Sequence, residues 1–456
     1  MIASVLAEWG TGPLDVPTEV RSAALRHLLD GVGCTIGGIR AGTVRPAVEV
    51  AVGLGGPAEA TVFGTRTRLG APAAALANGA LLHALDFDDT HAGGLVHATA
   101  VVLPAAFAVG QQVGASGRAV LDAAVVGYEA ACRIATAAPH GFHARGLHAT
   151  AVAGVFSSAL IAARLYVQDA ATAANALGIA GSQAGGLLAF LGTNASTKQL
   201  HPGFASQAGI LAARLAGAGA TGPESVFEGT NGLYAVLATG AIDTSVITSG
   251  LGQTWETTRI GIKPYPACQL SHATLDAVRD AMAKQPFSPD DVASIVAEVH
   301  PNSAPTVCPD DRDLARPQSG YAAKFSLPWS VAALLQDGDL GTISFESSSL
   351  ARPEVQDLAT RVTWHLTGGA GHAADAVGDV RVTLRDGTVV TGGVERSAGG
   401  PDNPLTYDQL VAKYTDNSGP RADDVLTLVE KLDTLDDLES LFDAVAAMNL
   451  AIGEHT

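Results

Sequence analysis

DVRVTLRDGTVVTGGVER, residues 379–396, is the stretch that divides this chain into two kinds of structure. Two runs of alternating apolar and polar residues flank Asp386 and Gly387, a dipeptide that favours the two-residue turn of a β-hairpin. VASIVAEVH (292–300) and RVTWHLTG (361–368) alternate in the same way. The sequence therefore predicts a small β-sheet in this part of the chain.

The residues on both sides of this region have helical patterning instead. Pro17 and Thr18 mark a helix start, with Glu19 in the first turn, where a carboxylate interacts favourably with the helix dipole. Apolar periodicity predicts further helices over residues 71–85, 128–138, 151–165, 321–338, 407–416 and 423–448. We predict a mainly α fold, in which residues 1–255 and 396–456 form a large all-helical domain and residues 256–395 an inserted, smaller α+β domain.

The composition argues against some classes of binding partner. The chain has 456 residues, of which 16% are charged, and a formal net charge of −18, which argues against nucleic acid and anionic membranes. Half of this charge lies on the last 55 residues, where twelve Asp and Glu oppose three Lys and Arg. The rest of the chain can therefore still form a local site for an anion.

The location is expected to be cytoplasmic. MIASVLAEWG, at the start of the chain, lacks the basic region and apolar run of a secretory signal. The long uncharged run from Gly146 to Ala163 is interpreted as a buried core helix, not as a membrane span. The four cysteines are scattered, without CxxC or Cys/His ligand spacing, so neither a zinc site nor an iron–sulfur cluster is expected.

Polar residues interrupt the apolar pattern most clearly in HALDFDDTHAGGLVHATAVVLPAA (83–106). Asp86 follows a predicted helix, and Thr90 and His97 flank a loop that contains two glycines. Such a loop can turn an imidazole and a carboxylate toward one point, which favours acid–base chemistry. An Asp/His metal site, or helix caps with surface histidines, are the alternatives.

Two more polar stretches follow. In HGFHARGLHATAVAG (140–154), His148 falls in the first turn of an apolar helix, where the dipole helps to keep the imidazole neutral. A capping or core role for His148 remains equally open. In GTNASTKQLHPG (192–203), Lys198 and His201 lie among amide and hydroxyl groups, as in a carboxylate-binding loop, or else face the solvent.

The fourth stretch is IKPYPACQLSHATLDAV (262–278). Its two prolines stiffen the chain, Lys263 lies at the predicted domain boundary, and His272 falls early in the next helix. Since small molecules often bind in clefts between domains, both are candidates for substrate binding. Lysines, histidines and aspartates without a nucleotide-binding loop or a Ser-His-Asp signature favour proton transfer beside a carboxylate, as in elimination, decarboxylation or epimerisation.

DFDDTH with a downstream histidine, GLHATAVAG, GTNASTKQLHPGFASQAG and KPYPACQLSHATLDA together resemble the MmgE/PrpD family, in its order and over nearly the whole chain. The family includes 2-methylcitrate dehydratase, cis-aconitate decarboxylase and iminodisuccinate epimerase. The resemblance implies enzymes that use no cofactor and no metal, a helical domain made from both chain ends, a smaller α+β lid and a homodimer.

The resemblance also implies a set of pocket residues. We expect the lysines and His272 to bind substrate carboxylates, two histidines to move protons, Asp86 to orient an imidazole and Thr90 to hydrogen-bond the substrate. The predicted catalytic residues are Asp86, Thr90, His97 and His148, and the predicted substrate-binding residues are Lys198, His201, Lys263 and His272. Two departures bear on the substrate: the loop between Thr90 and His97 is one residue longer than in the decarboxylase and lacks a proline after the histidine, and Trp329 stands where relatives often have Tyr.

The function expected from the sequence is therefore a lyase that acts on a small di- or tricarboxylate. An epimerase of an iminodisuccinate-like dicarboxylate is the nearest alternative, because it needs the same pocket. A non-catalytic carboxylate-binding protein is an alternative of another class. A metal-dependent hydrolase that uses Asp86, Asp89, His91 and His97 is a third.

Overall fold

The computed structural model describes residues 1–193 and 195–450. The chain forms two compact units. The helical unit contains Met1–Leu188, Thr197–Ile260 and the chain from Thr406 onward, whereas the α+β unit contains Ala189–Ser196 and Gly261–Leu405. The expected mainly α fold with a small α+β part is confirmed.

The helical unit is built mainly from helices, and its described strands have two residues each. Its helices are α1 (Ile2–Thr11), α2 (Thr18–Ala41), α3 (Arg45–Leu54), α4 (Ala71–His83), α5 (Ala98–Val113), α6 (Gly117–Thr136), α7 (Gly141–Ala144), α8 (Ala149–Leu165), α9 (Ala170–Gly181), α10 (Thr197–Gly217), α11 (Leu233–Leu237), α18 (Tyr407–Ser418), α19 (Asp423–Glu430) and α20 (Glu439–Ala447). Its strands are β1 (Ala60–Thr61), β2 (Arg68–Leu69) and β3 (Thr90–His91), and β4 (Ile260–Gly261) lies at its boundary.

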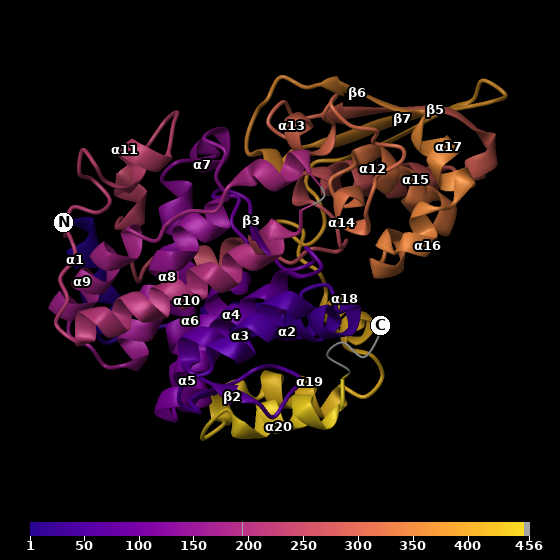
Figure 1. The fold of residues 1–456 in the computed structure, drawn as a ribbon. Coiled ribbons are helices and arrows are strands. Elements are labelled where there is room, and N and C mark those ends of the chain that lie inside the picture. Colours follow the sequence, from indigo (N-terminus) through magenta and orange to yellow (C-terminus); the bar gives the residue numbers. More distant parts are fainter. Residues whose placement is uncertain (194, 451–456) are drawn as a thin grey trace. The chain divides into compact units, whose positions relative to one another are not determined.

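Helices α4, α5, α8 and α10 pack on one another in the middle of this unit (Figure 1). Small residues allow their backbones to approach closely. A Cβ atom on Gly203 of α10 would lie 2.3 Å from the carbonyl oxygen of Leu76 of α4, and one on Gly209 would lie 2.6 Å from that of Val155 of α8. Interiors at this density have few voids and low compressibility, so the helix ends are held firmly in place.

The C-terminal helices belong to the same unit, as predicted from the return of helical patterning. Tyr414 of α18 packs on Gly33 of α2. Phe442 of α20 packs on Phe63 and Phe107. The centroid of its ring lies 4.6 Å from that of Phe63 and 6.3 Å from that of Phe107. Figure 1 shows α20, in yellow, beside β2 and α5. Both ends of the chain therefore contribute to one core; residues 451–456 of the acidic tail lie outside the described residues.

The α+β unit contains a four-stranded sheet in the order β6-β5-β7-β8. The strands are β5 (Val292–Val299), β6 (Val362–Leu366), β7 (Gly378–Leu384) and β8 (Val389–Val394), and the helices are α12 (His272–Lys284), α13 (Ala304–Val307), α14 (Gly320–Ala323), α15 (Leu327–Asp337), α16 (Ser347–Leu350) and α17 (Pro353–Ala359). β7 and β8 form the predicted antiparallel hairpin, with Gly387 at a φ of +89° in its turn. Helix α12 packs against both of these strands.

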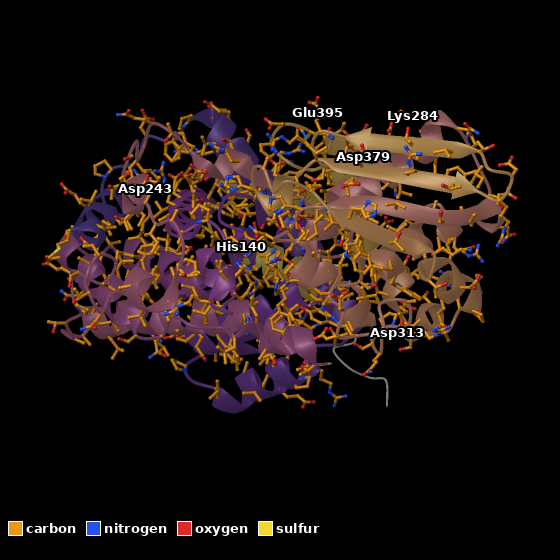
Figure 2. The ribbon with its side chains drawn as sticks, turned by 90° about the horizontal axis from the view of Figure 1, so that it is seen from above. His140, Asp243, Lys284, Asp313, Asp379 and Glu395 are labelled. Atoms are coloured by element: carbon orange, nitrogen blue, oxygen red, sulfur yellow. The ribbon has the colours of Figure 1, made fainter. Side chains whose placement is uncertain are left out.

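Polar side chains of this unit lie at its surface. Figure 2 shows Asp379 of β7, Glu395 just after β8, and Lys284 at the end of α12, all three exposed. The sheet therefore follows the expected alternation, with Val380 and Val382 of β7 buried.

The long uncharged run from Gly146 to Ala163 lies in α8 and its preceding turn, and α8 is a core helix, as expected. Within residues 1–193 and 195–450, no helix combines the length and the apolar character that crossing a membrane requires. All four cysteines are buried.

Candidate active site

The loop between α4 and α5 is held in place by side chains from α10 and α18 and by His97 at its own end. Gln199 of α10 donates to the carbonyl oxygen of Ala84 at 2.6 Å, and Lys413 of α18 donates to that of Phe87 at 2.7 Å. His97 Nδ1 lies 2.8 Å from the carbonyl oxygen of Asp89. A loop whose carbonyl groups are fixed in this way positions its carboxylates with little freedom.

Asp86 is the first functional group on this loop. Its backbone has a φ of +51°, a left-handed conformation that costs free energy for a residue other than glycine. Asp86 Oδ1 accepts a hydrogen bond from Lys198 Nζ at 2.9 Å, and both side chains are buried. The structure thus joins Asp86 to a lysine from the first turn of α10, which the sequence placed in a separate loop.

His97 and His148 occupy equivalent places in two neighbouring helices. Each is the residue before a helix, α5 and α8 respectively, and each begins the same pentapeptide, His-Ala-Thr-Ala-Val. The threonine of the second copy, Thr150, accepts a hydrogen bond from the backbone N–H of His97 at 3.0 Å. The two imidazole rings are 5.7 Å apart, so the repeated segment places two candidate proton carriers side by side.

The hydrogen bonds of these rings indicate their tautomers. Because a carbonyl oxygen accepts only, Nδ1 of His97 carries the proton in its contact with Asp89. Thr90 Oγ1 is a further 3.1 Å contact of the same nitrogen. His97 Nε2 faces Asp86 Oδ1 at 3.9 Å, a distance at which the carboxylate stabilises a positive charge on the imidazole.

His148 is held in the neutral form. Its Nδ1 contacts Nδ1 of His201 at 3.1 Å, and its Nε2 has no hydrogen-bond partner among the described residues. Burial lowers the pKa of His148 well below its ordinary value, with a smaller contribution from the nearby Lys198 ammonium. Burial likewise lowers the pKa of His201 to about 4, assisted by His83 and Lys198. The His148 ring is therefore uncharged at neutral pH, and its lowered pKa makes it a weak base.

His83 is a further candidate side chain, which the sequence pattern did not indicate. It is the last residue of α4 and fully buried, and its Nδ1 donates to both oxygens of Asp88 at 2.9 Å. Its ring lies 4.9 Å from that of His97 and 5.8 Å from that of His148. We call His83, His97, His148 and His201 the histidine cluster.

Asp89 and His91 direct their side chains elsewhere. The Asp89 carboxylate accepts from the backbone and hydroxyl of Thr99, and burial raises its pKa to about 7. His91 Nε2 pairs with Glu256 at 2.8 Å. The ligand set Asp86, Asp89, His91 and His97 is therefore not assembled, because two of its members are engaged with other partners.

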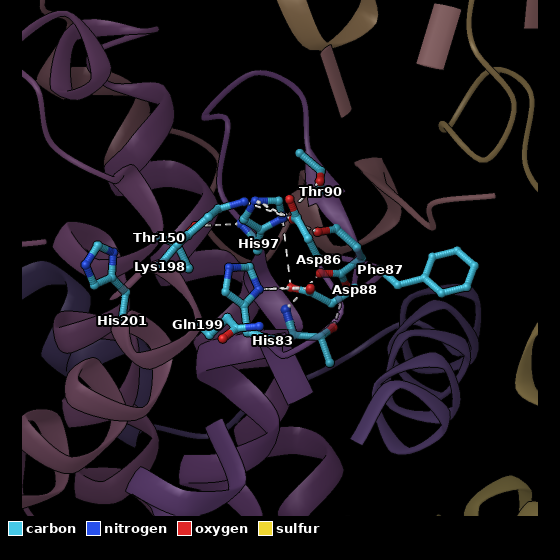
Figure 3. A network of polar contacts seen from close by, with 12 residues as sticks. His83, Asp86, Phe87, Asp88, Thr90, His97, Thr150, Lys198, Gln199 and His201 are labelled. Carbon is cyan, nitrogen blue, oxygen red and sulfur yellow. Dashed lines mark hydrogen bonds and ion pairs between the residues drawn. The ribbon is translucent and has the colours of Figure 1, made fainter. Parts of the chain in front are cut away.

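Six of the eight predicted site residues belong to the helical unit: Asp86, Thr90, His97, His148, Lys198 and His201. Figure 3 shows the side chains of Asp86, His97 and Lys198 beside one another. Lys263 and His272 belong to the α+β unit. Both are buried there, and His272 Nε2 lies 3.1 Å from the carbonyl oxygen of Ala267. Their role in substrate binding stays a prediction. Trp329 is fully buried in α15, and its indole nitrogen has no hydrogen-bond partner within the described part of the chain.

His83 and Lys413 were missed for different reasons. His83 ends a continuous apolar helix, where a lone histidine is commonly a core residue, and its pairing with Asp88 depends on the turn of the loop. Lys413 lies 326 residues from the carbonyl group that it holds, so no local pattern could connect the two. The repeated His-Ala-Thr-Ala-Val was the available signal that His97 and His148 are a matched pair.

Comparison with known proteins assigns this arrangement to a family. The MmgE/PrpD N-terminal domain matches residues 6–244, and the MmgE/PrpD C-terminal domain matches residues 265–434. The chain is 29% identical to a cis-aconitate decarboxylase of Aspergillus terreus over 473 aligned residues, which cover 97% of this chain and 95% of the relative. It is 28% identical to the cis-aconitate decarboxylase-like protein oryM of Aspergillus oryzae, over 91% of this chain and 89% of the relative.

The human relative extends the comparison. The chain is 28% identical to the cis-aconitate decarboxylase of Homo sapiens, over 80% of this chain and 77% of the relative. The two matched domains and the relatives agree with the lyase chemistry expected from the buried lysine, carboxylates and imidazoles. The chain therefore belongs to the MmgE/PrpD family, and it is a lyase of the decarboxylase and dehydratase type.

Proposed function

We propose that the protein decarboxylates cis-aconitate or a closely similar unsaturated tricarboxylate. The observation that carries this proposal is the approach of the Lys198–Asp86 pair to a cluster of buried imidazoles, two of which begin adjacent helices. The relatives named cis-aconitate decarboxylase cover nearly the whole chain and support this choice of reaction.

The proposed role of each side chain follows from its surroundings. Lys198 is a buried cation that binds a substrate carboxylate while sharing its charge with Asp86. His97 and His148, whose rings lie 5.7 Å apart, carry the one proton that the reaction delivers to carbon. Thr90 lies next to the His97 ring and provides a hydroxyl for the substrate or for that ring.

The chemistry requires one proton to be delivered to carbon. As the bond between the carbon chain and one carboxylate breaks, carbon dioxide leaves and the electron pair that remains on the chain takes up the proton. Lys263 and His272 would bind the remaining carboxylates, as the family resemblance implies. This mechanism rests on the acid–base groups of the chain itself.

The experiment is a screen by NMR of cis-aconitate, citrate, 2-methylcitrate and iminodisuccinate in deuterated water. Release of carbon dioxide with one deuterium bound to the product chain supports the decarboxylase. Loss of water without loss of carbon identifies a dehydratase. Exchange with inversion and no loss of either identifies an epimerase. Ligand-induced thermal stabilisation without any turnover would overturn the proposal in favour of a carboxylate-binding protein.

We further infer that the protein acts as a homodimer. Phe204, Leu211 and Leu215 lie on one face of α10 and are exposed by 47%, 45% and 50%. The spacing of these apolar side chains is that of a helix stripe covered by another surface, and a second copy of the chain is the occupant expected for the family. The cytoplasmic location expected from the sequence stays a prediction.

A further inference from the structure

We propose that His83, His97 and His148 form a binding site for a divalent transition-metal ion of the zinc type. One ring nitrogen of each residue lies within 4.8 Å of the other two, and all three side chains are buried. Imidazole nitrogens bind zinc at about 2.0–2.1 Å, which places the nitrogens of a tetrahedral site about 3.3 Å apart. Side-chain movements on the order of 1 Å bring the three nitrogens from their present separation to that of a tetrahedral site.

The second nitrogen of each ring is held in the way that metal-binding histidines usually are. His83 Nδ1 donates to the Asp88 carboxylate, and His97 Nδ1 donates to the carbonyl oxygen of Asp89. His148 Nδ1 contacts the ring of His201. A carboxylate, carbonyl or similar partner on one nitrogen fixes the tautomer and directs the lone pair of the other nitrogen to a metal.

Two of these other nitrogens point to a missing ligand. Nε2 of His83 and Nε2 of His148 are fully enclosed, and neither has a hydrogen-bond partner among the described residues. Because buried polar atoms are nearly always satisfied, two such atoms in one cluster require an explanation. A metal ion shared with His97 satisfies both at once.

The charges around the cluster favour a cation. Asp86 and Asp88 are fully buried, and either one can join His83 in an alternative ligand set. The Lys198 ammonium is paired with Asp86 at 2.9 Å, and Asp88, which accepts from His83 Nδ1, adds a further negative charge beside the cluster. Three imidazoles leave a fourth position, which Asp86 or a water molecule fills.

The chemical class of the ion follows from its ligands. Imidazole nitrogens select zinc, cobalt, nickel and copper, whereas magnesium and calcium prefer oxygen ligands. Because His97 and His148 are also the proposed proton carriers, an ion bound to them blocks proton transfer. This consequence rests on the proposed lyase function: the ion is an inhibitor that competes with the substrate.

The test uses cobalt as a spectroscopic probe on the full chain, after treatment with a chelator. We expect Co²⁺ to produce the visible absorption bands of a tetrahedral site with one equivalent bound, and Zn²⁺ to displace it. Asp88→Asn should weaken zinc binding by about 10- to 100-fold, because it removes a partner of a ligand. His83→Gln and His148→Gln should weaken it further.

His365→Gln is the matched control, because the His365 side chain is 72% exposed on β6, outside the cluster. It should bind Co²⁺ like the wild type. Absence of tetrahedral bands in the wild type, or equal binding by wild type, Asp88→Asn and His148→Gln proteins that melt cooperatively, overturns the site. This readout needs no turnover, so it separates failure of the metal site from failure of the lyase proposal. In active protein, Zn²⁺ should inhibit turnover and a chelator should restore it.

Discussion

Lys198 Nζ lies 2.9 Å from Asp86 Oδ1 in the interior of the helical unit, although the two residues are 112 positions apart in the chain. Burying an ion pair removes both charges from water, and this cost commonly exceeds the attraction between them. A pair of this kind is weak evidence for stability. Its position beside the histidine cluster instead agrees with a charge that is kept for binding an anion.

Lys198→Met should separate stability from function. The substitution leaves the Asp86 carboxylate buried without its cation and should lower the free energy of unfolding by about 3–5 kcal/mol. Adding Asp86→Asn should restore most of that loss but not the turnover, because the cationic anchor is still missing. Urea denaturation and steady-state kinetics of both proteins measure this. A double variant that regains turnover would contradict the role of Lys198.

Replacing either imidazole of the matched pair should slow the reaction. We expect His97→Gln and His148→Gln each to lower kcat by about 10²–10⁴, the usual contribution of a positioned acid or base. His365→Gln, at the surface of the other unit, should leave kcat unchanged. If both cluster variants fold, as judged by circular dichroism, and keep near-full turnover, neither histidine moves a proton.

The burial of His27 predicts how the free energy of unfolding changes in acid. Burial lowers its pKa from 6.5 to about 4, with the Thr257 carbonyl opposing this and Arg26 and Lys413 assisting. The unfolded chain therefore binds a proton between pH 6.5 and about 4 that the folded chain excludes, so this group removes stability as the pH falls through that window. At about pH 4 this group lowers the free energy of unfolding by about 3 kcal/mol.

The variant His27→Gln should lack this part of the acid sensitivity. Asp89, whose pKa burial raises to about 7, contributes the opposite trend, and its Oδ2 lies 3.4 Å from His27 Nδ1, so the comparison also includes the change that the substitution makes at Asp89. Urea denaturation of the two proteins at several values between pH 7 and pH 4 gives the difference. Parallel pH profiles for wild type and variant would show that His27 is not kept neutral by the fold.

Gly203→Ala should damage the site through packing. The new Cβ atom would lie 2.3 Å from the carbonyl oxygen of Leu76, so α10 must shift away from α4. We expect a loss of about 1–3 kcal/mol in the free energy of unfolding, together with lower kcat because α10 carries Lys198. Gly53→Ala in α3 is the matched control, since nothing lies within 4 Å of its added Cβ, and it should be neutral or stabilising.

The exposed stripe on α10 predicts the oligomeric state. Leu211→Lys should convert a homodimer into a monomer with an unchanged circular dichroism spectrum, because Leu211 is already 45% exposed in the single chain. Light scattering coupled to size exclusion measures the mass. A wild type that is monomeric at all accessible concentrations, or a variant that stays dimeric, would contradict this interface.

The sequence predicted the parts of the fold that local patterns control. The helices follow from apolar periodicity, and the hairpin follows from alternation around Asp386 and Gly387. The left-handed backbone of Asp86 could not be predicted in this way, because the surrounding contacts impose it. The predicted domain boundaries at residues 255 and 395 stay predictions.

The candidate site was predictable in its residue types but not in its pairs. Lys198, His97 and His148 stand out as polar groups in apolar surroundings, and the resemblance to the family collected them. The pairings of His83 with Asp88 and of Lys198 with Asp86 depend on how α4, α5 and α10 meet. Such contacts between distant segments have no signature in one sequence.

Because His97 and His148 stand at the starts of α5 and α8, the distance between their rings also depends on how these two helices pack farther along their length. Gly154 of α8 lies against Val101 of α5, where an added Cβ would come within 2.5 Å of a valine methyl group. A larger residue at position 154 would spread the two helices and widen the gap between the rings of His97 and His148. This one contact between Gly154 and Val101 therefore sets the separation of the two proposed proton carriers, although neither residue belongs to the histidine cluster.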